Sequence, residues 1–484
     1  KHLLIASLLK LAEQRHLLFF NIHHIIADGW SMGLLLRDWA QYYAQLTIGK
    51  GTTLPDLTVQ YSDFASWQKN WLCGDILERQ MSYWKNQLNH LQILELPMDR
   101  PRGNSEHQKQ GATIGFSFNK ELSEKLNQLA KSQDVSLYML LVSGFFILLH
   151  RYCNEDDVAV GSPVAGRMRT EVEDLIGFFV NTLVIRSHYH AESTFAQYLK
   201  QIRDTALDGY AHQDIPFEKL VEAIQPERQL SHHPLFQVMF ALQNAPVPTY
   251  FASDLQAKAI ETHSGQAKFD LFFSLFESDE QIGGQVEYQC QLFKESTIHR
   301  FINSYQLILE AVCEQQEIRL KHIEIVSQQE KQQILIGWND THKTYATPKL
   351  VHQWVEQSAN QMPDNIAIYF NGVETSYQQL DKQANQVAHY LNQQNIGLND
   401  QVGLLLPRST ELVTMMLAVL KAGACYIPLD PEYPQDRLKY MLDDAKISIL
   451  ISQEKQLKSI QDYQGKILDL ANSQTDIENC PESP

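Results

Sequence analysis

The feature that most constrains the fold of this chain is an alternation of short apolar runs with amphipathic helical segments, which occurs in two separate regions. In the first region, residues 112–325, the strand-length run IGFSF precedes predicted helices at 120–132 and 137–152. In the second, which begins at Leu350, the run IAIYF precedes a predicted helix at 377–394. Strands that alternate with helices are typical of layered α/β domains. The sequence therefore predicts two α/β regions.

The stretch between these regions, residues 326–347, is polar and contains several Gln and Thr residues. Such a composition between two patterned regions is typical of a linker. At roughly 150 residues per domain, the length of 484 residues favours about three domains.

Charge and hydropathy narrow the range of partners. The chain has 40 basic and 57 acidic side chains, which gives a formal net charge of −17. A chain of this charge repels phosphate backbones and anionic lipids. The longest apolar stretch, Met139 to Leu149, has about half the length that a bilayer span requires. We expect neither a nucleic acid nor a membrane as a partner.

The cysteines bear on metal sites and on the cellular compartment. They stand at positions 73, 153, 290, 313, 425 and 480. This spacing is too wide for a zinc knuckle or a CxxC pair, and the number is too small for a disulfide framework. We expect no metal site, and a reducing cytoplasm as the location.

The strongest local signal is the HHxxxDG pattern of residues 23 to 29. The apolar run 17–22 reads as a strand that ends at His23 and His24, and Ser31 reads as the N-cap of the following helix. Successive side chains of a strand point to opposite faces, so at most one of the two histidines is expected to face a cavity. A neutral imidazole at such a position can accept a proton from an amine or a hydroxyl group.

The other motif residues suit structural roles. We expect Asp28 to hold the loop through a charge-assisted hydrogen bond or an ion pair. Gly29 permits a backbone conformation, or a close approach by a ligand, that a side chain would block. The alternative is that the histidines are hydrogen-bonded core residues and that Asp-Gly is an ordinary turn. The chain shows no GxSxG, GxGxxG or HExxH pattern and no phosphate-binding Gly-Lys loop, which disfavours the enzyme classes that rely on them.

A larger set of motifs resembles the condensation domain of nonribosomal peptide synthetases. These motifs are NIHHIIADGWSMGLL, YSDFASWQ, LELPMDRPR, VAVGSPVAGR, IGFFVNTLVIR and the segment 212–240. The resemblance covers residues 1–325 and implies a chloramphenicol-acetyltransferase-like fold, in which two α/β lobes enclose a tunnel. It implies that 1–102 belongs to the first lobe and 112–325 forms the second. Residues 348–484 resemble the opening of an adenylation domain, through VETSYQQLDKQANQVAHYL and MMLAVLKAGACYIPLDPEYPQDRLKYMLDDA.

The resemblance implies amide-bond formation between a peptidyl or acyl thioester donor and an aminoacyl thioester acceptor. It assigns the catalytic role to His24, either as a general base or as a group that positions the amine. His23 and Asp28 then have structural roles, and Gly29 lies at the centre of the tunnel. Asn181 matches a position near the tunnel, where it would contact substrate. The expected ion-pair partner of Asp28 is an arginine, with Arg167 and Arg169 as candidates.

The implied partners are upstream and downstream carrier domains, which hold the substrates on 4′-phosphopantetheine arms, and the adjoining adenylation domain. ATP and Mg²⁺ are implied for a complete adenylation domain only. Family members have on the order of a hundred residues before HHxxxDG. Here 22 residues precede it, so we expect most of the first lobe to be lacking. Two alternatives remain: a non-catalytic platform that docks carrier proteins, and an epimerisation-type domain of the same fold.

Overall fold

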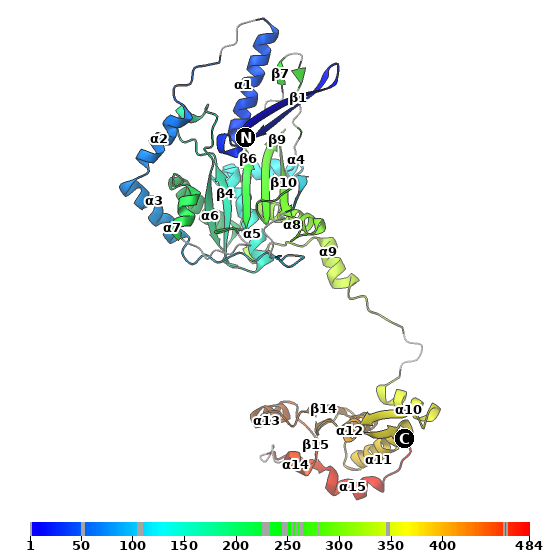
Figure 1. The fold of residues 1–484 in the computed structure, drawn as a ribbon. Coiled ribbons are helices and arrows are strands. Elements are labelled where there is room, and N and C mark those ends of the chain that lie inside the picture. Colours follow the sequence, from blue (N-terminus) through cyan, green and yellow to red (C-terminus); the bar gives the residue numbers. More distant parts are fainter. Residues whose placement is uncertain are drawn as a thin grey trace. The chain divides into compact units, whose positions relative to one another are not determined.

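The structure is a computed structural model that forms two compact units, Lys1–Asp340 and Thr341–Pro484 (Figure 1). Each unit has its own buried core and is described by itself. Part of the predicted segment 212–240 and the predicted boundary at residue 348 lie outside the described residues. The structure describes residues 2–49, 54–103, 110–224, 233–243, 250–252, 255–256, 260, 265–278, 280–344, 349–457, 460 and 463–484.

A six-stranded sheet with the order β3-β10-β9-β6-β4-β5 is the centre of the first unit. Strand β6 runs parallel to β4 and β9, and the other neighbouring strands are antiparallel. The mixed sheet is built from the region predicted as α/β. Its strands are β3 (Gly111–Ser117), β4 (Asp157–Val164), β5 (Asn181–His188), β6 (Val238–Gln243), β9 (Leu271–Ser278) and β10 (Gln281–Gln289).

Helices pack against this sheet and complete the core. The apolar stretch that contains Phe145 and Phe146 forms the centre of α5, where both side chains are fully buried. Helix α5 begins after Ser136, whose hydroxyl accepts a hydrogen bond from the Met139 amide. Tyr305 of α8 donates to the Leu141 carbonyl at 2.9 Å and joins the two helices. The helices are α4 (Lys120–Ser132), α5 (Leu137–Cys153), α6 (Phe195–Ala211) and α8 (Glu295–Glu314).

Within the described residues, no single helix is both long and apolar enough to cross a bilayer. Helices α4 and α5 meet these criteria only as a pair, and a bend of 108° separates them.

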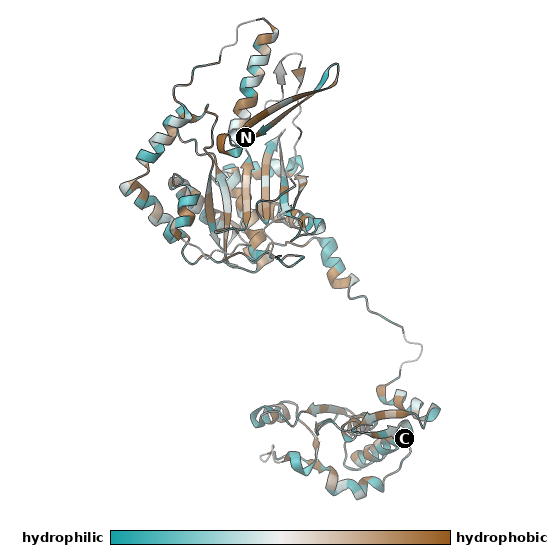
Figure 2. Cartoon of the chain, in the orientation of Figure 1, coloured by the Kyte–Doolittle hydropathy of each residue, from teal (hydrophilic) through white to brown (hydrophobic). Residues whose placement is uncertain are grey.

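A hairpin of β1 (Leu4–Ala12) and β2 (Arg15–Ile22) precedes the HHxxxDG motif. Its apolar side chains are largely exposed, with exposed fractions of 65% for Leu8 and 45% for Phe19. Most residues of the hairpin are hydrophobic, as their colour in Figure 2 shows. After it come a short 3₁₀ helix, η1 (His24–Ile26), and the long helix α1 (Gly29–Thr47).

Several further elements surround the sheet of the first unit. Helices α2 and α3 follow α1 along the chain, and η3 follows α8. The further elements are α2 (Tyr61–Trp71), α3 (Gly74–Gln87), η2 (Thr170–Val172), α7 (Phe217–Ile224), β7 (Tyr250–Ala252), β8 (Leu255–Gln256) and η3 (Leu320–His322).

The first half of the predicted linker, residues 326–347, is partly helical. It contains α9 (Gln328–Gln332) and a π-helical turn, η4 (Gln333–Gly337). The physical reason is a capping box. The Ser327 hydroxyl accepts from the Glu330 amide at 3.2 Å, and the Glu330 carboxylate accepts from the Ser327 amide at 3.1 Å.

The second unit contains a four-stranded parallel sheet with the order β14-β13-β15-β16. Its centre is apolar, with Leu404 and Ile451 fully buried. Three helices are joined by Lys421 of α12, whose Nζ contacts Glu356 at 2.5 Å and Asp381 at 2.9 Å. The elements are α10 (Val351–Gln361), β11 (Ile366–Phe370), β12 (Val373–Ser376), α11 (Tyr377–Gln393), β13 (Gln401–Leu405), α12 (Thr410–Lys421), β14 (Cys425–Leu429), α13 (Gln435–Asp444), β15 (Ile449–Ser452), α14 (Glu454–Leu457), β16 (Ile467–Asp469) and α15 (Leu470–Glu478).

Candidate functional site

The two histidines of the motif lie just beyond the end of β2, not on it. The strand ends at Ile22, and His24 is the first residue of η1. The prediction that the two histidines lie on a strand was therefore wrong, and strand alternation does not decide where their side chains point. The chain turns here because His23 caps η1: its Nδ1 accepts a hydrogen bond from the Ile25 amide at 3.1 Å. The His23 ring thus serves the local turn.

His24 borders a large cavity in the first unit, with a volume of about 1020 Å³. Its ring contacts the ring of Phe178 edge to face, with centroids 5.2 Å apart and an interplanar angle of 89°. The cavity wall is mostly apolar, and His23 is not part of it. The wall residues are His24, Ile25, Asp28, Gly29, Trp30, Pro163, Val164, Ala165, Phe178, Val180, Thr182, Met239, Ala241, Leu242, Gln243, Gln266, Lys268, Phe269, Phe272 and Glu287.

Asp28 holds the start of α1 and pairs with Arg167. Its Oδ1 accepts from the Ser31 amide at 2.8 Å, so Asp28 is the N-cap, and the expectation that Ser31 caps this helix was wrong. Its Oδ2 accepts from the Phe179 amide at 3.0 Å. Arg167 Nη2 lies 3.4 Å from Asp28 Oδ1, and both side chains are buried. Of the two candidate partners, Arg169 instead places its guanidinium over the ring of Trp67, 4.5 Å from the centroid.

The environment of Asp28 favours the carboxylate form. Burial is the largest influence and by itself raises the pKa of Asp28. Hydrogen bonds from Ser31 and Phe179, together with the charge of Arg167, outweigh it, so the pKa lies below its ordinary value. Burial lowers the pKa of Arg167, and Asp28 opposes this effect. The pair is therefore a desolvated ion pair whose two members depend on each other.

A network around Ser31 fastens the motif to the loop between β4 and β5. The buried Ser31 hydroxyl donates to the Gly177 carbonyl at 2.8 Å and accepts from the Gly177 amide at 3.1 Å. Arg167 Nη2 donates to the same hydroxyl at 2.9 Å, and Nη1 donates to the Leu175 carbonyl at 2.8 Å. These contacts fix the segment that carries His24 against the six-stranded sheet.

Gly29 needs no special backbone conformation in this structure. Its φ is not positive, and a Cβ built on it meets no atom within 4 Å. The interpretation that glycine is required for a turn was therefore wrong, because Asp28 caps the helix and Gly29 begins it. Gly29 borders the cavity of His24, so the alternative interpretation, close approach by a ligand, stays a prediction.

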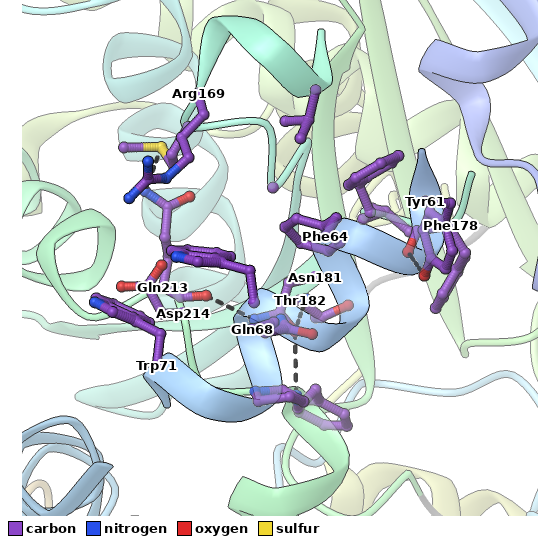
Figure 3. Close-up of a pocket in the computed structure, with 18 of the residues that line it drawn as sticks. Tyr61, Phe64, Gln68, Trp71, Arg169, Phe178, Asn181, Thr182, Gln213 and Asp214 are labelled. Atoms are coloured by element: carbon purple, nitrogen blue, oxygen red, sulfur yellow. Dashed lines mark hydrogen bonds between the residues drawn. The ribbon is translucent and has the colours of Figure 1, made fainter. Parts of the chain in front are cut away.

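Asn181 borders a second cavity of about 250 Å³, which Figure 3 shows. Its Nδ2 donates to the carbonyls of Gln213 at 2.8 Å and Ile215 at 2.7 Å. Its Oδ1 accepts from the Phe217 amide at 3.1 Å. The amide is therefore engaged with the backbone that leads into α7. The predicted contact of Asn181 with substrate stays a prediction.

The second cavity has an aromatic wall that comes mainly from α2. The rings of Trp67 and Trp71 are stacked, with centroids 5.2 Å apart. The two cavities share three wall residues, Phe178, Val180 and Thr182. The wall residues of the second cavity are Tyr61, Phe64, Trp67, Gln68, Trp71, Gly166, Met168, Arg169, Val172, Phe178, Phe179, Val180, Asn181, Thr182, Gln213, Asp214, Pro216, Phe217 and Glu218.

Sequence reasoning missed Phe178 and Tyr61. The IGFFVNTLVIR motif is apolar from residue 176 onward, but β5 begins at Asn181. The backbone of residues 177–179 bonds instead to Ser31, Tyr61 and Asp28. Tyr61 OH donates to the Phe178 carbonyl at 2.8 Å. A signal was available: of two adjacent phenylalanines before a strand, at most one can face the core.

No group of three or more His, Cys, Asp or Glu side chains suited to a metal ion occurs among the described residues. All six cysteines are unpaired thiols.

Comparison with known proteins shows the family. The model of the condensation domain matches residues 1–335, and that of the AMP-binding enzymes matches residues 355–481. A linear gramicidin synthase of Brevibacillus parabrevis is 41% identical over 471 residues, which are 96% of this chain and 6% of that protein. Gramicidin S synthase 2 of Aneurinibacillus migulanus is 38% identical over 468 residues, 96% of this chain and 10% of its own. The chain thus spans about a tenth or less of the length of these relatives.

Solved structures confirm the predicted α/β fold class. A four-domain nonribosomal peptide synthetase bound to AMP and glycine matches with a TM-score of 0.79 at 24% identity, over 98% of this chain and 37% of that one. The X-domain from teicoplanin biosynthesis matches 67% of this chain and 75% of its own, with a TM-score of 0.60 at 24% identity. The first unit thus has the chloramphenicol-acetyltransferase-like condensation fold. The chain belongs to the condensation-domain family of nonribosomal peptide synthetases and continues into the start of an AMP-binding domain.

Proposed function

We propose that this chain forms peptide bonds between a carrier-bound acyl or peptidyl thioester and a carrier-bound aminoacyl thioester. The acceptor α-amine attacks the donor thioester carbonyl, a C–N bond forms and the C–S bond breaks. The donor phosphopantetheine arm leaves as a thiol after it takes up a proton, and the amine loses a proton. Because the thioester is already activated, the principal task of the protein is to orient the amine and to keep it neutral.

The observation that carries this proposal is the place of His24 at the edge of the large cavity. The cavity of about 1020 Å³ has room for reacting groups beside the imidazole. The segment that carries His24 is fastened by Asp28, Arg167 and Ser31. An imidazole held on such a segment can accept the proton of the amine or hold the amine by a hydrogen bond. In this proposal His24 is the catalytic residue, His23 and Asp28 are structural, and Gly29 leaves space for the substrate.

The proposed partners are upstream and downstream carrier domains, whose 4′-phosphopantetheine arms bring both substrates, and the adjoining adenylation domain. The arms are substrate groups and are not attached to this chain. ATP and Mg²⁺ belong to the reaction of a complete adenylation domain and take no part in the proposed transfer. A cytoplasmic location stays a prediction.

Two other functions use the same fold. An epimerisation-type domain would exchange the α-hydrogen of a carrier-bound residue, and a docking platform would bind carriers without chemistry. The cavity beside His24 favours a catalytic function over a platform, since a docking surface needs no interior space.

The test uses the natural polypeptide that contains this chain. It is mixed in D₂O with a donor carrier that holds an acetylaminoacyl thioester and an acceptor carrier that holds an aminoacyl thioester, across a panel of proteinogenic amino acids. Intact-mass measurement follows both carriers. We expect the acceptor to gain the mass of the donor acyl group for at least one combination. Deuterium at the α-carbon without transfer would establish epimerisation instead. Carrier binding with neither change across the panel would establish the platform.

A further inference from the structure

The orientation of the His24 ring has an unusual basis. Within the described part of the chain, neither ring nitrogen of His24 makes a hydrogen bond. Catalytic imidazoles are commonly oriented by a carboxylate or a carbonyl that binds the second nitrogen. At this site, the ring contact of His24 is the edge-to-face packing with Phe178 at 5.2 Å. An aromatic ring therefore stands where a polar partner is often found.

The backbone on both sides of Phe178 is firmly held. The Gly177 amide donates to Ser31 Oγ at 3.1 Å, and the Phe179 amide donates to Asp28 Oδ2 at 3.0 Å. The carbonyl of Phe178 itself accepts from Tyr61 OH at 2.8 Å, which Figure 3 shows as a dashed line. Three successive residues are thus anchored to α1 and α2, and the anchors on α1 lie a few residues after His24. Such anchoring holds the backbone that carries the Phe178 ring close to the segment that carries His24.

The side chain of Phe178 is not a core residue. It is 37% exposed, whereas the next side chain, Phe179, is 5% exposed. Phe178 borders both the cavity of His24 and the aromatic cavity beside α2. Its ring therefore forms part of the wall between them, in contact with the imidazole on the side of the large cavity. A half-exposed phenylalanine contributes little to the core, so its position calls for another explanation.

We propose that Phe178 is a positioning residue that holds the imidazole of His24 toward the large cavity. This inference rests on the proposed catalytic role of His24. A carboxylate in the place of Phe178 would occupy one ring nitrogen and favour the protonated imidazole. The aromatic edge-to-face contact orients the ring through dispersion and the quadrupole of the phenyl group, and it leaves both nitrogens open to the reacting amine and to water.

The first experiment measures single-turnover transfer between loaded carriers for Phe178→Ala, Phe178→Leu and Phe178→Tyr in the natural polypeptide. Loss of the interaction free energy of such an aromatic pair corresponds to a change of roughly fivefold in rate. We expect Phe178→Ala and Phe178→Leu to slow transfer by about that factor or more, with an unchanged KM for the acceptor carrier. Phe178→Tyr keeps the ring and is expected to restore the rate. Phe276 is 38% exposed and borders neither cavity, so Phe276→Ala is the matched control, with a rate near that of the wild type.

The second experiment combines Phe178→Ala with His24→Ala. If Phe178 acts through His24, its substitution has no further effect when the imidazole is absent. We also expect the side-chain NMR signals of His24, but not those of His23, to broaden or split in Phe178→Ala. This readout reports the orientation of the ring and is independent of turnover.

The outcomes separate this inference from the proposed function. Wild-type transfer by His24→Ala would overturn the proposed role of His24. Loss of transfer in His24→Ala, with wild-type rates in folded Phe178→Ala and Phe178→Leu, would overturn the positioning role alone. Equal losses from Phe178→Ala with and without His24 would also overturn it. If neither Phe178 variant folds, Phe178 is a structural residue and the positioning role is rejected.

Discussion

The ion pair between Asp28 and Arg167 is the residue-scale feature on which the site depends most. Both side chains are buried, and the carboxylate also accepts two backbone hydrogen bonds. Asp28→Asn keeps the shape but leaves a buried guanidinium without its counter-charge, so we expect a loss of about 3 kcal/mol in the unfolding free energy of the first unit. Urea unfolding of the wild type and of Asp28→Asn measures this loss. The control is Asp174→Asn, since the exposed pair of Asp174 with Arg37 at 2.7 Å should contribute less than about 1 kcal/mol. Equal effects would contradict the account.

The pH dependence of this stabilisation has a definite sign. The pKa of Asp28 is lower in the folded chain than its ordinary value, so the unfolded chain binds the proton more readily. Its contribution is complete above the ordinary value of about 4 and is lost as the pH falls through the lower folded value. We expect the difference in unfolding free energy between the wild type and Asp28→Asn to be constant above about pH 5 and to shrink in more acidic solution. A difference that grows in acid would show that Asp28 is protonated in the folded chain.

Two glycines of the site are expected to respond in opposite ways. A Cβ at Gly29 enters open space in the cavity, so Gly29→Ala should fold with unchanged or slightly higher stability, while Gly29→Leu should block transfer. A Cβ at Gly177 would lie 2.2 Å from the Tyr61 ring, so Gly177→Ala should destabilise the loop. Thermal unfolding and transfer assays check both. Full transfer by a folded Gly29→Leu would remove Gly29 from the substrate path.

Sequence reasoning reached some residues of the site and not others. An acidic residue before a glycine predicted a structural carboxylate, a role that stays a prediction, and Arg167, one of the two candidate partners, pairs with Asp28. The sequence could not rank Arg167 above Arg169 as the partner of Asp28. The choice depends on which of the two side chains points toward α1 from the loop between β4 and β5. Ser31 was misread as a cap, because a serine and an aspartate near a helix start satisfy the same local rule. The tertiary contact with Gly177 decided between them.

At the scale of elements, the attachment of α1 to the loop between β4 and β5 determines the position of the motif. The buried Ser31 hydroxyl takes part in three hydrogen bonds, with Gly177 and Arg167. Ser31→Ala removes all three hydrogen bonds and leaves the Gly177 amide without an acceptor, although the Gly177 carbonyl keeps the Asp28 amide and Arg167 keeps Asp28. We expect a loss of about 2 kcal/mol in unfolding free energy. Hydrogen exchange of the Gly177 and Phe179 amides should accelerate. Ser82→Ala, at an exposed position of α3, is the control. Unchanged exchange at both amides would show that α1 is held by other contacts.

Elements with strong local signals were predicted closely. Helix α4 runs from Lys120 to Ser132 as expected, because Asn119 caps it and its apolar residues recur at helical spacing. The junction after β2 was not predicted. The apolar pattern continues to Ile22, and the 3₁₀ turn begins at His24. This turn depends on the hydrogen bond from the Ile25 amide to the His23 side chain, and an apolar strand pattern cannot predict such a bond. The helix in the linker was missed because α9 is only five residues long, which is too short for a helical apolar repeat.

At the scale of the whole molecule, the two units have separate cores and should unfold separately. The first core includes Phe145 of α5 and the second includes Leu404 of β13, each fully buried. Phe145→Ala should lower the stability of the first unit by about 3–5 kcal/mol, and Leu404→Ala that of the second by about 2–5 kcal/mol. Calorimetry with each variant should show one transition shifted and the other unchanged. A single transition that moves with either substitution would contradict two independent units.

The central claim is that His24 acts on the amine at the edge of the large cavity while its neighbour His23 serves the turn. The most direct test is the single-turnover rate of peptide transfer between loaded carriers for His24→Ala and His23→Ala, measured by intact mass in the natural polypeptide. We predict that His24→Ala abolishes or strongly slows transfer while carrier binding persists. His23→Ala should instead lower stability, through the lost bond to the Ile25 amide, and retain transfer in the folded fraction. Transfer by His24→Ala at the wild-type rate would contradict the account.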